Sequence, residues 1–65
     1  MTTSTLQLQW NCLMIERLVT GLVLQGVNDN RKIIDVVATH YKPETEFEME
    51  MYSEAIIYAK CALLN

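Results

Sequence analysis

Residues Leu6–Val27 read LQLQWNCLMIERLVTGLVLQGV, and the placement of their apolar side chains determines the architecture predicted for this chain. At about 3.6 residues per turn, its apolar side chains fall on two opposite sides of one helix. We name them the first face and the second face of this helix. The first face carries Leu8, Cys12, Ile15, Val19, Leu22 and Val23. The second face carries Leu6, Trp10, Leu13 and Leu24.

A helix with two apolar faces has more surface to cover than a small monomer can supply. A surface helix of a globular protein normally buries one apolar stripe and leaves its other side to water. This chain has 65 residues, and a domain of that size buries only about 60% of the surface that its unfolded chain exposes. We therefore predict that the second face packs against another chain.

Helix start and stop signals divide the chain into three segments. The hydroxyl side chains of residues 2–5 can cap a helix N-terminus, and Gly26 is the usual kind of residue to end one. The side chains of residues 28–30 favour a turn because they bond the nearby backbone. Pro43 closes the next segment and suits the first turn of the last one. The predicted helices span residues 5–25, 30–41 and 44–64 of one domain, residues 1–65.

The middle segment fits two kinds of secondary structure. One helical face would carry Ile33, Ile34, Val37, Ala38 and Tyr41. Yet the β-branched residues of this segment also favour a strand. A strand needs a partner strand, and the chain offers no second candidate. We therefore predict a helix here.

The last segment has an acidic beginning and a long helical pattern. Thr45 and Glu48 have the spacing of a capping box. Glutamates alternate with apolar residues over 46–51, as in a strand, but helical spacing continues through the rest of the segment. The predicted buried face carries Phe47, Met51, Ala55, Tyr58 and Ala62, widened by Tyr52, Ile56, Ala59 and Leu63.

These lengths predict an all-α architecture. The first and last segments are each about 20 residues, or ~30 Å, long. We expect them to form an antiparallel pair joined by the short middle helix. Two such pairs would assemble as a homodimer with a four-helix-type core. The second face is then the oligomer interface.

The cysteines and the histidine give no support for a metal site. Cys12 and Cys61 are too few for a disulfide-stapled secreted scaffold, and we predict buried, reduced thiols. A Cys12–Cys61 disulfide is the alternative. With His40 they make three candidate zinc ligands without a close pair, whereas a structural zinc site takes four. We predict no metal and no cofactor.

Charge and hydropathy favour a cytoplasmic protein. The N-terminus has no positive charge ahead of its apolar run, so we expect no signal peptide. Glu16 and Arg17 interrupt that run, and a charged residue at the centre of a membrane helix costs about 2.5–3.5 kcal/mol. The net charge is −3, and residues 44–65 carry five glutamates against one lysine. Membrane insertion and binding to nucleic acid are therefore both disfavoured.

Two features are candidates for contacting a partner. Glu46, Glu50 and Glu54 lie one turn apart, although like charges at this spacing cost about 0.2–0.5 kcal/mol per pair. This acidic stripe could meet a basic surface of another protein, or it could simply keep the protein soluble. Trp10 could anchor a homodimer, dock a foreign partner or pack against the middle helix.

No residues combine into a catalytic motif. His40 has no oriented nucleophile or acid beside it in the sequence, and near a helix C-terminus it suits a capping role. Gly21 and Gly26 stand alone, without a phosphate-binding loop. The methionines and tyrosines are predicted to fill the core: Met1, Met14, Met49, Met51, Tyr41, Tyr52 and Tyr58. We predict that the protein is not an enzyme.

The function predicted from these patterns is a small helical homo-oligomer that regulates or adapts other proteins by binding them. From the small size and the acidic charge alone, we expect a host-directed regulator of the phage or plasmid type. One alternative is a structural subunit of a heteromeric complex, whose second face would pack on a different chain. Another is a nucleic-acid-binding module that would use Arg17, Arg31, Lys32 and Lys42 in a dimer.

Overall fold

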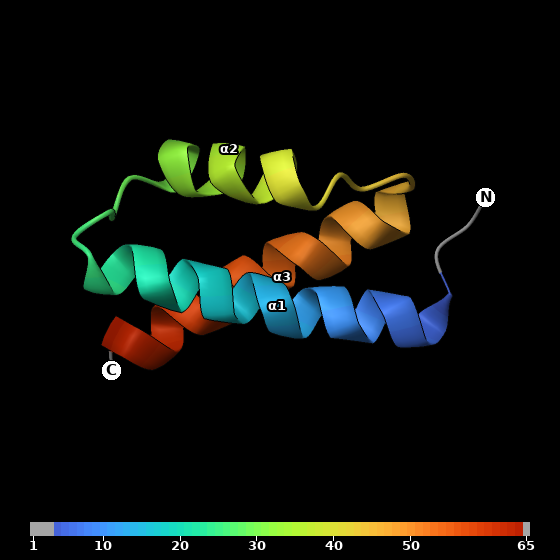
Figure 1. The fold of residues 1–65 in the computed structure, drawn as a ribbon, viewed down its shortest axis with the longest axis horizontal. Coiled ribbons are helices and arrows are strands. Elements are labelled where there is room, and N and C mark those ends of the chain that lie inside the picture. The colour runs from blue at the N-terminus through green and yellow to red at the C-terminus, as the bar shows by residue number, and fades with distance from the viewer. Residues whose placement is uncertain (1–3, 65) are drawn as a thin grey trace.

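The computed structural model describes residues 4–64, and they form three helices with no strand among them (Figure 1). Helix α1 is Thr5–Leu24, α2 is Asn30–His40 and α3 is Glu46–Leu64. The helical prediction for the middle segment is confirmed. The third helix begins two residues later than predicted.

Short-range hydrogen bonds fix the ends of α1 and the start of α2. Ser4 caps α1, its hydroxyl accepting a hydrogen bond from the Gln7 amide at 3.1 Å. Gly26 has a φ of 93°, a backbone conformation that glycine adopts without a steric penalty. This lets the Val27 amide donate to the Leu22 carbonyl at 2.9 Å and end the helix. Asp29 then caps α2, accepting from the Arg31 amide at 3.0 Å.

Helix α3 begins with the predicted capping box. The Thr45 hydroxyl accepts a hydrogen bond from the Glu48 amide at 3.1 Å. The Glu48 carboxylate in turn accepts from the Glu44 amide at 2.8 Å, one residue before the usual position in this motif. Glu48 is only 5% exposed. Its carboxylate therefore holds the connection to α2 against the start of α3.

The two long helices run parallel to each other, so the prediction of an antiparallel pair was wrong. The Asn11 side chain, in the first half of α1, donates to the Tyr52 hydroxyl in the first half of α3 at 2.9 Å. Lys60, near the end of α3, donates to the carbonyl of Asn28, just beyond the end of α1, at 3.4 Å. The reason is the path of α2, which runs back along α1 before α3 begins (Figure 1). Its 11 residues cover ~16 Å, so the chain returns to the end where α1 started.

The core lies where the first face of α1 meets α3 and α2. Its buried residues are Ile15, Val19, Ile33, Val37, Tyr52, Ala55 and Ala59. The other members of the first face are partly buried and pack against this cluster: Leu8, Cys12, Leu22 and Val23. The first face of α1 is therefore confirmed as the side that the chain covers itself.

The predicted buried face of α3 is confirmed for Met51, Tyr52, Ala55, Ile56 and Ala59, but it was wrong for Phe47, Tyr58, Ala62 and Leu63. Phe47 and Tyr58 are 56% and 67% exposed, whereas Tyr52 and Ala59 are each only 4% exposed. Apolar residues surround α3 on nearly every side, so spacing alone does not show which of them meet α1. The small Ala55 and Ala59 are buried in the core cluster, where close packing leaves little room for a larger side chain.

Candidate protein-interaction surfaces

The second face of α1 is open to solvent in the single chain. Its four members, Leu6, Trp10, Leu13 and Leu24, are between 53% and 80% exposed. None of them is among the apolar residues that pack against the buried core cluster, and Trp10 keeps 59% of its surface exposed. Arg17 is also exposed and lies on the same side of the helix, between Leu13 and Leu24.

The total exposed area supports the view that a surface is left uncovered. The chain exposes 4952 Å². A folded monomer of 7.5 kDa is expected to expose about 4250 Å². The excess is roughly 700 Å², and exposed large apolar side chains on all three helices contribute to it.

Gly21 borders the second face and leaves space beside the helix. A Cβ atom built on Gly21 has no non-local heavy atom within 4 Å. The glycine is therefore not needed for any close approach between helices within the described chain. Its small size has a structural use only if another molecule packs at this point.

The acidic stripe, Glu46, Glu50 and Glu54, lies exposed along α3. The side-chain carboxylates of Glu46 and Glu50 have no hydrogen-bond or ion-pair partner among residues 4–64. Together with Met49, Ser53 and Ile57, the three glutamates line a shallow hollow of about 600 Å³. The stripe is thus joined to exposed apolar side chains rather than isolated on a polar surface.

A second apolar region lies between α2 and α3, and the sequence patterns did not predict it. Each of these helices packs on α1, but they make few close backbone approaches to each other. Two hollows of about 240 and 260 Å³ lie between them. Both hollows are lined by Ile34, Ser53 and Ile56, so we treat them as one feature, the α2–α3 groove.

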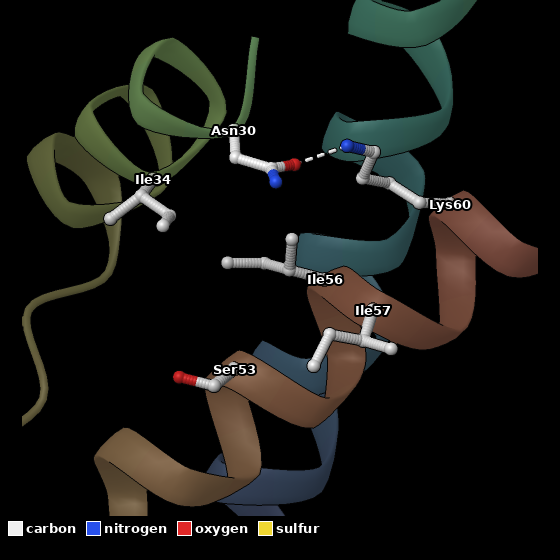
Figure 2. Close-up of a pocket in the computed structure, with 6 residues that line it drawn as sticks. All are labelled: Asn30, Ile34, Ser53, Ile56, Ile57 and Lys60. Atoms are coloured by element: carbon white, nitrogen blue, oxygen red, sulfur yellow. Dashed lines mark hydrogen bonds between the residues drawn. The ribbon is translucent and has the colours of Figure 1, made fainter. Parts of the chain in front are cut away.

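Figure 2 shows how the side chains of the groove lie. Ile56 and Ser53 point from α3 toward α2, and Ile34 lies on the opposite wall. Lys60 donates a hydrogen bond to the Asn30 side chain, which ties the two helices together at one end of the groove. Ile34 is 53% exposed, so the predicted inward face of α2 holds for Ile33 and Val37 but not for Ile34.

The methionines and tyrosines divide between core and surface. Met51 and Tyr41 pack against the core, and Tyr52 belongs to it. Met49 is 56% exposed at the α2–α3 groove, and Tyr58 is exposed as well, so both were wrongly predicted as core residues. Met1 lies outside the described residues.

The candidate ligand and redox residues are dispersed. Both cysteines are free, but Cys61 is exposed, because it lies on the side of α3 that faces away from Ala55 and Ala59. Burial raises the pKa of the Cys12 thiol, with smaller contributions from the charges of Glu16 and Glu54. Within residues 4–64, no three His, Cys, Asp or Glu side chains gather as a metal site would require.

The remaining charged groups do not form a common surface. His40 lies exposed at the end of α2, with its Nδ1 3.0 Å from the Val36 carbonyl oxygen. Arg31 and Lys32 lie at the start of α2 and Lys42 beyond its end, so ~16 Å of helix separates them. Lys42 is therefore not brought together with Arg31 and Lys32 within one chain.

Among the described residues, none of the helices is both long and apolar enough to cross a membrane. No protein-family model, curated protein or solved structure matches the chain.

Proposed function

We propose that this chain is a small non-catalytic helical protein that self-associates and acts as a protein-binding regulator or adaptor. The observation that supports self-association is the exposure of Leu6, Trp10, Leu13 and Leu24 on the second face of α1. In a two-fold dimer the same patch meets itself, so one apolar helix face can supply both sides of the interface. The two α1 helices would then lie at the centre of four long helices.

The acidic stripe supports the second part of the proposal. Glu46 and Glu50 have no partner of opposite charge within the described chain, and they lie on α3, a different helix from the second face. Self-association through α1 would therefore leave these carboxylates free to meet a basic surface of another protein. Charge complementarity of this kind guides partner choice and speeds association.

The test is the molar mass in solution, measured by light scattering after size exclusion, with circular dichroism on the same fractions. Leu13→Glu places a charge in the second face. Phe47→Glu is the matched control, because Phe47 is 56% exposed and Leu13 53% exposed, and Phe47 lies on α3. We expect a helical dimer for the wild type and for Phe47→Glu, and a monomer for Leu13→Glu.

An unchanged oligomer for Leu13→Glu would contradict the assignment of the interface. A wild-type chain that is monomeric and poorly helical would favour the structural-subunit alternative, in which another protein covers the second face. A helical, monodisperse monomer at all concentrations would rule out self-association.

A further inference from the structure

The α2–α3 groove has the length and the chemistry of a site for one helix. It extends from Asn30 and Lys60 at one end to Tyr41 and Pro43 at the other. This distance is the length of α2, whose 11 residues cover ~16 Å, or about three helical turns. A bound helix of that length would place three or four side chains in the groove.

The walls of the groove are apolar and exposed. Ile34 on α2 and Met49 and Ile57 on α3 are between 53% and 61% exposed. Ser53 lies between them as a small side chain that permits close approach. Methionine adapts its shape to different apolar groups. Such a surface fits the apolar stripe of an amphipathic helix, with anchors spaced three and four residues apart.

The backbone around the groove excludes the other common way of binding a peptide. Both walls are helices, whose amide and carbonyl groups are used within each helix. The described chain offers no sheet edge to which an extended peptide could add a strand. Side chains must therefore supply the recognition, as they do in helix-in-groove complexes.

The acidic stripe beside the groove indicates which charge a bound helix should carry. Ser53 and Ile57 line both the groove and the adjoining hollow that contains Glu46, Glu50 and Glu54. A helix seated in the groove would thus present one flank to three carboxylates spaced one turn apart. Lysine or arginine at the same spacing on that flank would complement them. The same carboxylates would repel nucleic-acid phosphates and anionic lipids.

We infer that the α2–α3 groove binds a basic amphipathic helix of another protein, with its apolar stripe on Ile34, Met49 and Ile57 and its basic flank on the acidic stripe. This inference rests on the proposed role as a protein-binding adaptor and names the class of partner. It places partner binding on a surface that shares no residue with the second face of α1.

The test uses the full chain and two designed helical peptides of about 18 residues, or five turns. Both peptides carry the same leucine stripe, one flanked by lysines and the other by glutamates. Binding is measured by fluorescence anisotropy, and the site is mapped by amide chemical-shift changes. We expect the lysine peptide to bind at least tenfold more tightly than the glutamate peptide, with shifts centred on Ser53 and Ile57.

Matched variants separate groove binding from general attraction of charge. Ile57→Glu should weaken binding of the lysine peptide at least tenfold, whereas Phe47→Glu, which adds the same charge outside the groove, should not. The triple variant Glu46→Gln, Glu50→Gln, Glu54→Gln should weaken binding more than the charge-matched triple Glu16→Gln, Asp35→Asn, Glu44→Gln. The inference would be overturned if the two single variants, or the two triple variants, weakened binding of the lysine peptide equally. Amide chemical-shift changes centred on Trp10 would overturn it as well.

Two further results keep the two proposals apart. The Leu13→Glu variant should bind the lysine peptide like the wild type even if it is monomeric. Conversely, if Ile57→Glu lowers the molar mass of the protein, a second copy of the chain occupies the groove and the inference is wrong. Loss of self-association in Leu13→Glu alone bears only on the proposed function.

Discussion

The two faces of α1 carry similar apolar residues but meet opposite surroundings. Ile15 and Val19 on the first face are 0% exposed, while Leu6 and Leu24 on the second face are 80% and 73% exposed. The difference arises from what the chain can place against each side. Helices α2 and α3 cover the first face, and the described chain provides no third layer for the second. An apolar helix face is therefore buried only where another helix of the chain packs on it, however apolar the face is.

The largest difference between the two faces should appear in the free energy of unfolding when a side chain of each face is truncated to alanine. Ile15→Ala leaves a cavity in the core and should cost about 2–5 kcal/mol of the free energy of unfolding. A domain of this length has a total stability of roughly 3–10 kcal/mol. Leu13→Ala should change the stability of the monomer by less than about 0.5 kcal/mol, because the side chain is exposed.

Urea unfolding followed by circular dichroism, at a concentration where the wild type is monomeric, measures both values. Equal losses for Ile15→Ala and Leu13→Ala would show that the second face is covered within the chain itself.

A smaller contrast of the same kind exists on α3, between Glu48 and Glu50. Glu48 is buried and accepts the hydrogen bond from the Glu44 amide at the start of the helix. Glu48→Ala should cost about 1–2 kcal/mol, because a capping bond is lost. Glu50→Ala, on the exposed stripe, should change stability by less than about 0.5 kcal/mol. Thermal unfolding of the two variants compares them, and equal melting temperatures would contradict the assigned capping role of Glu48.

Gly21→Ala adds a methyl group at the border of the second face, so it should affect the monomer and a dimer differently. Nothing beyond neighbouring backbone lies within 4 Å of an added Cβ, and alanine favours a helix over glycine by ~1 kcal/mol. The monomer should therefore become more stable by about that amount in urea unfolding. If a second α1 packs closely at this point, the same variant should raise the dimer dissociation constant. A less stable monomer would mean that the space beside Gly21 is filled.

The smallest effect concerns the reactivity of the two thiols. Cys12 is half-buried on the first face and Cys61 is exposed, so a maleimide should modify Cys61 first, as peptide mass spectrometry would show. Faster modification of Cys12 would contradict its partly buried position against the core.

Burial also raises the pKa of the Cys12 thiol, which links this residue to the pH dependence of stability. The folded chain then holds this proton more tightly than the unfolded chain does. That contribution to stability is present below the ordinary thiol pKa and is lost as pH rises through the raised pKa.

Local signals in the sequence predicted the helices and their ends. Ser4, Gly26, Asp29 and the Thr45–Glu48 pair act through bonds to residues only a few positions away. The residues of the first face of α1 were also predicted, because their helical spacing places six apolar side chains on one side of the helix, and all six lie in or against the core.

The relative direction of the long helices and the groove were not predictable in the same way. Helical periodicity does not encode the path of α2, which decides that α1 and α3 run parallel. On α3, apolar residues on nearly all sides left the choice between Tyr52 and Tyr58 to tertiary packing. The α2–α3 groove arises from the distance between α2 and α3 where they pack on α1, and the sequence pattern of either helix does not predict that distance.

The emission spectrum of Trp10, recorded across a dilution series, tests whether a second copy of the chain covers the second face. Trp10 is the single tryptophan of the chain, and it lies on the second face, 59% exposed. If a second copy covers this face, emission should shift to longer wavelength on dilution, in step with the fall in molar mass. The shift should be absent in Leu13→Glu and present in Phe47→Glu. A spectrum that stays the same while the mass falls would show that the chain self-associates through another surface.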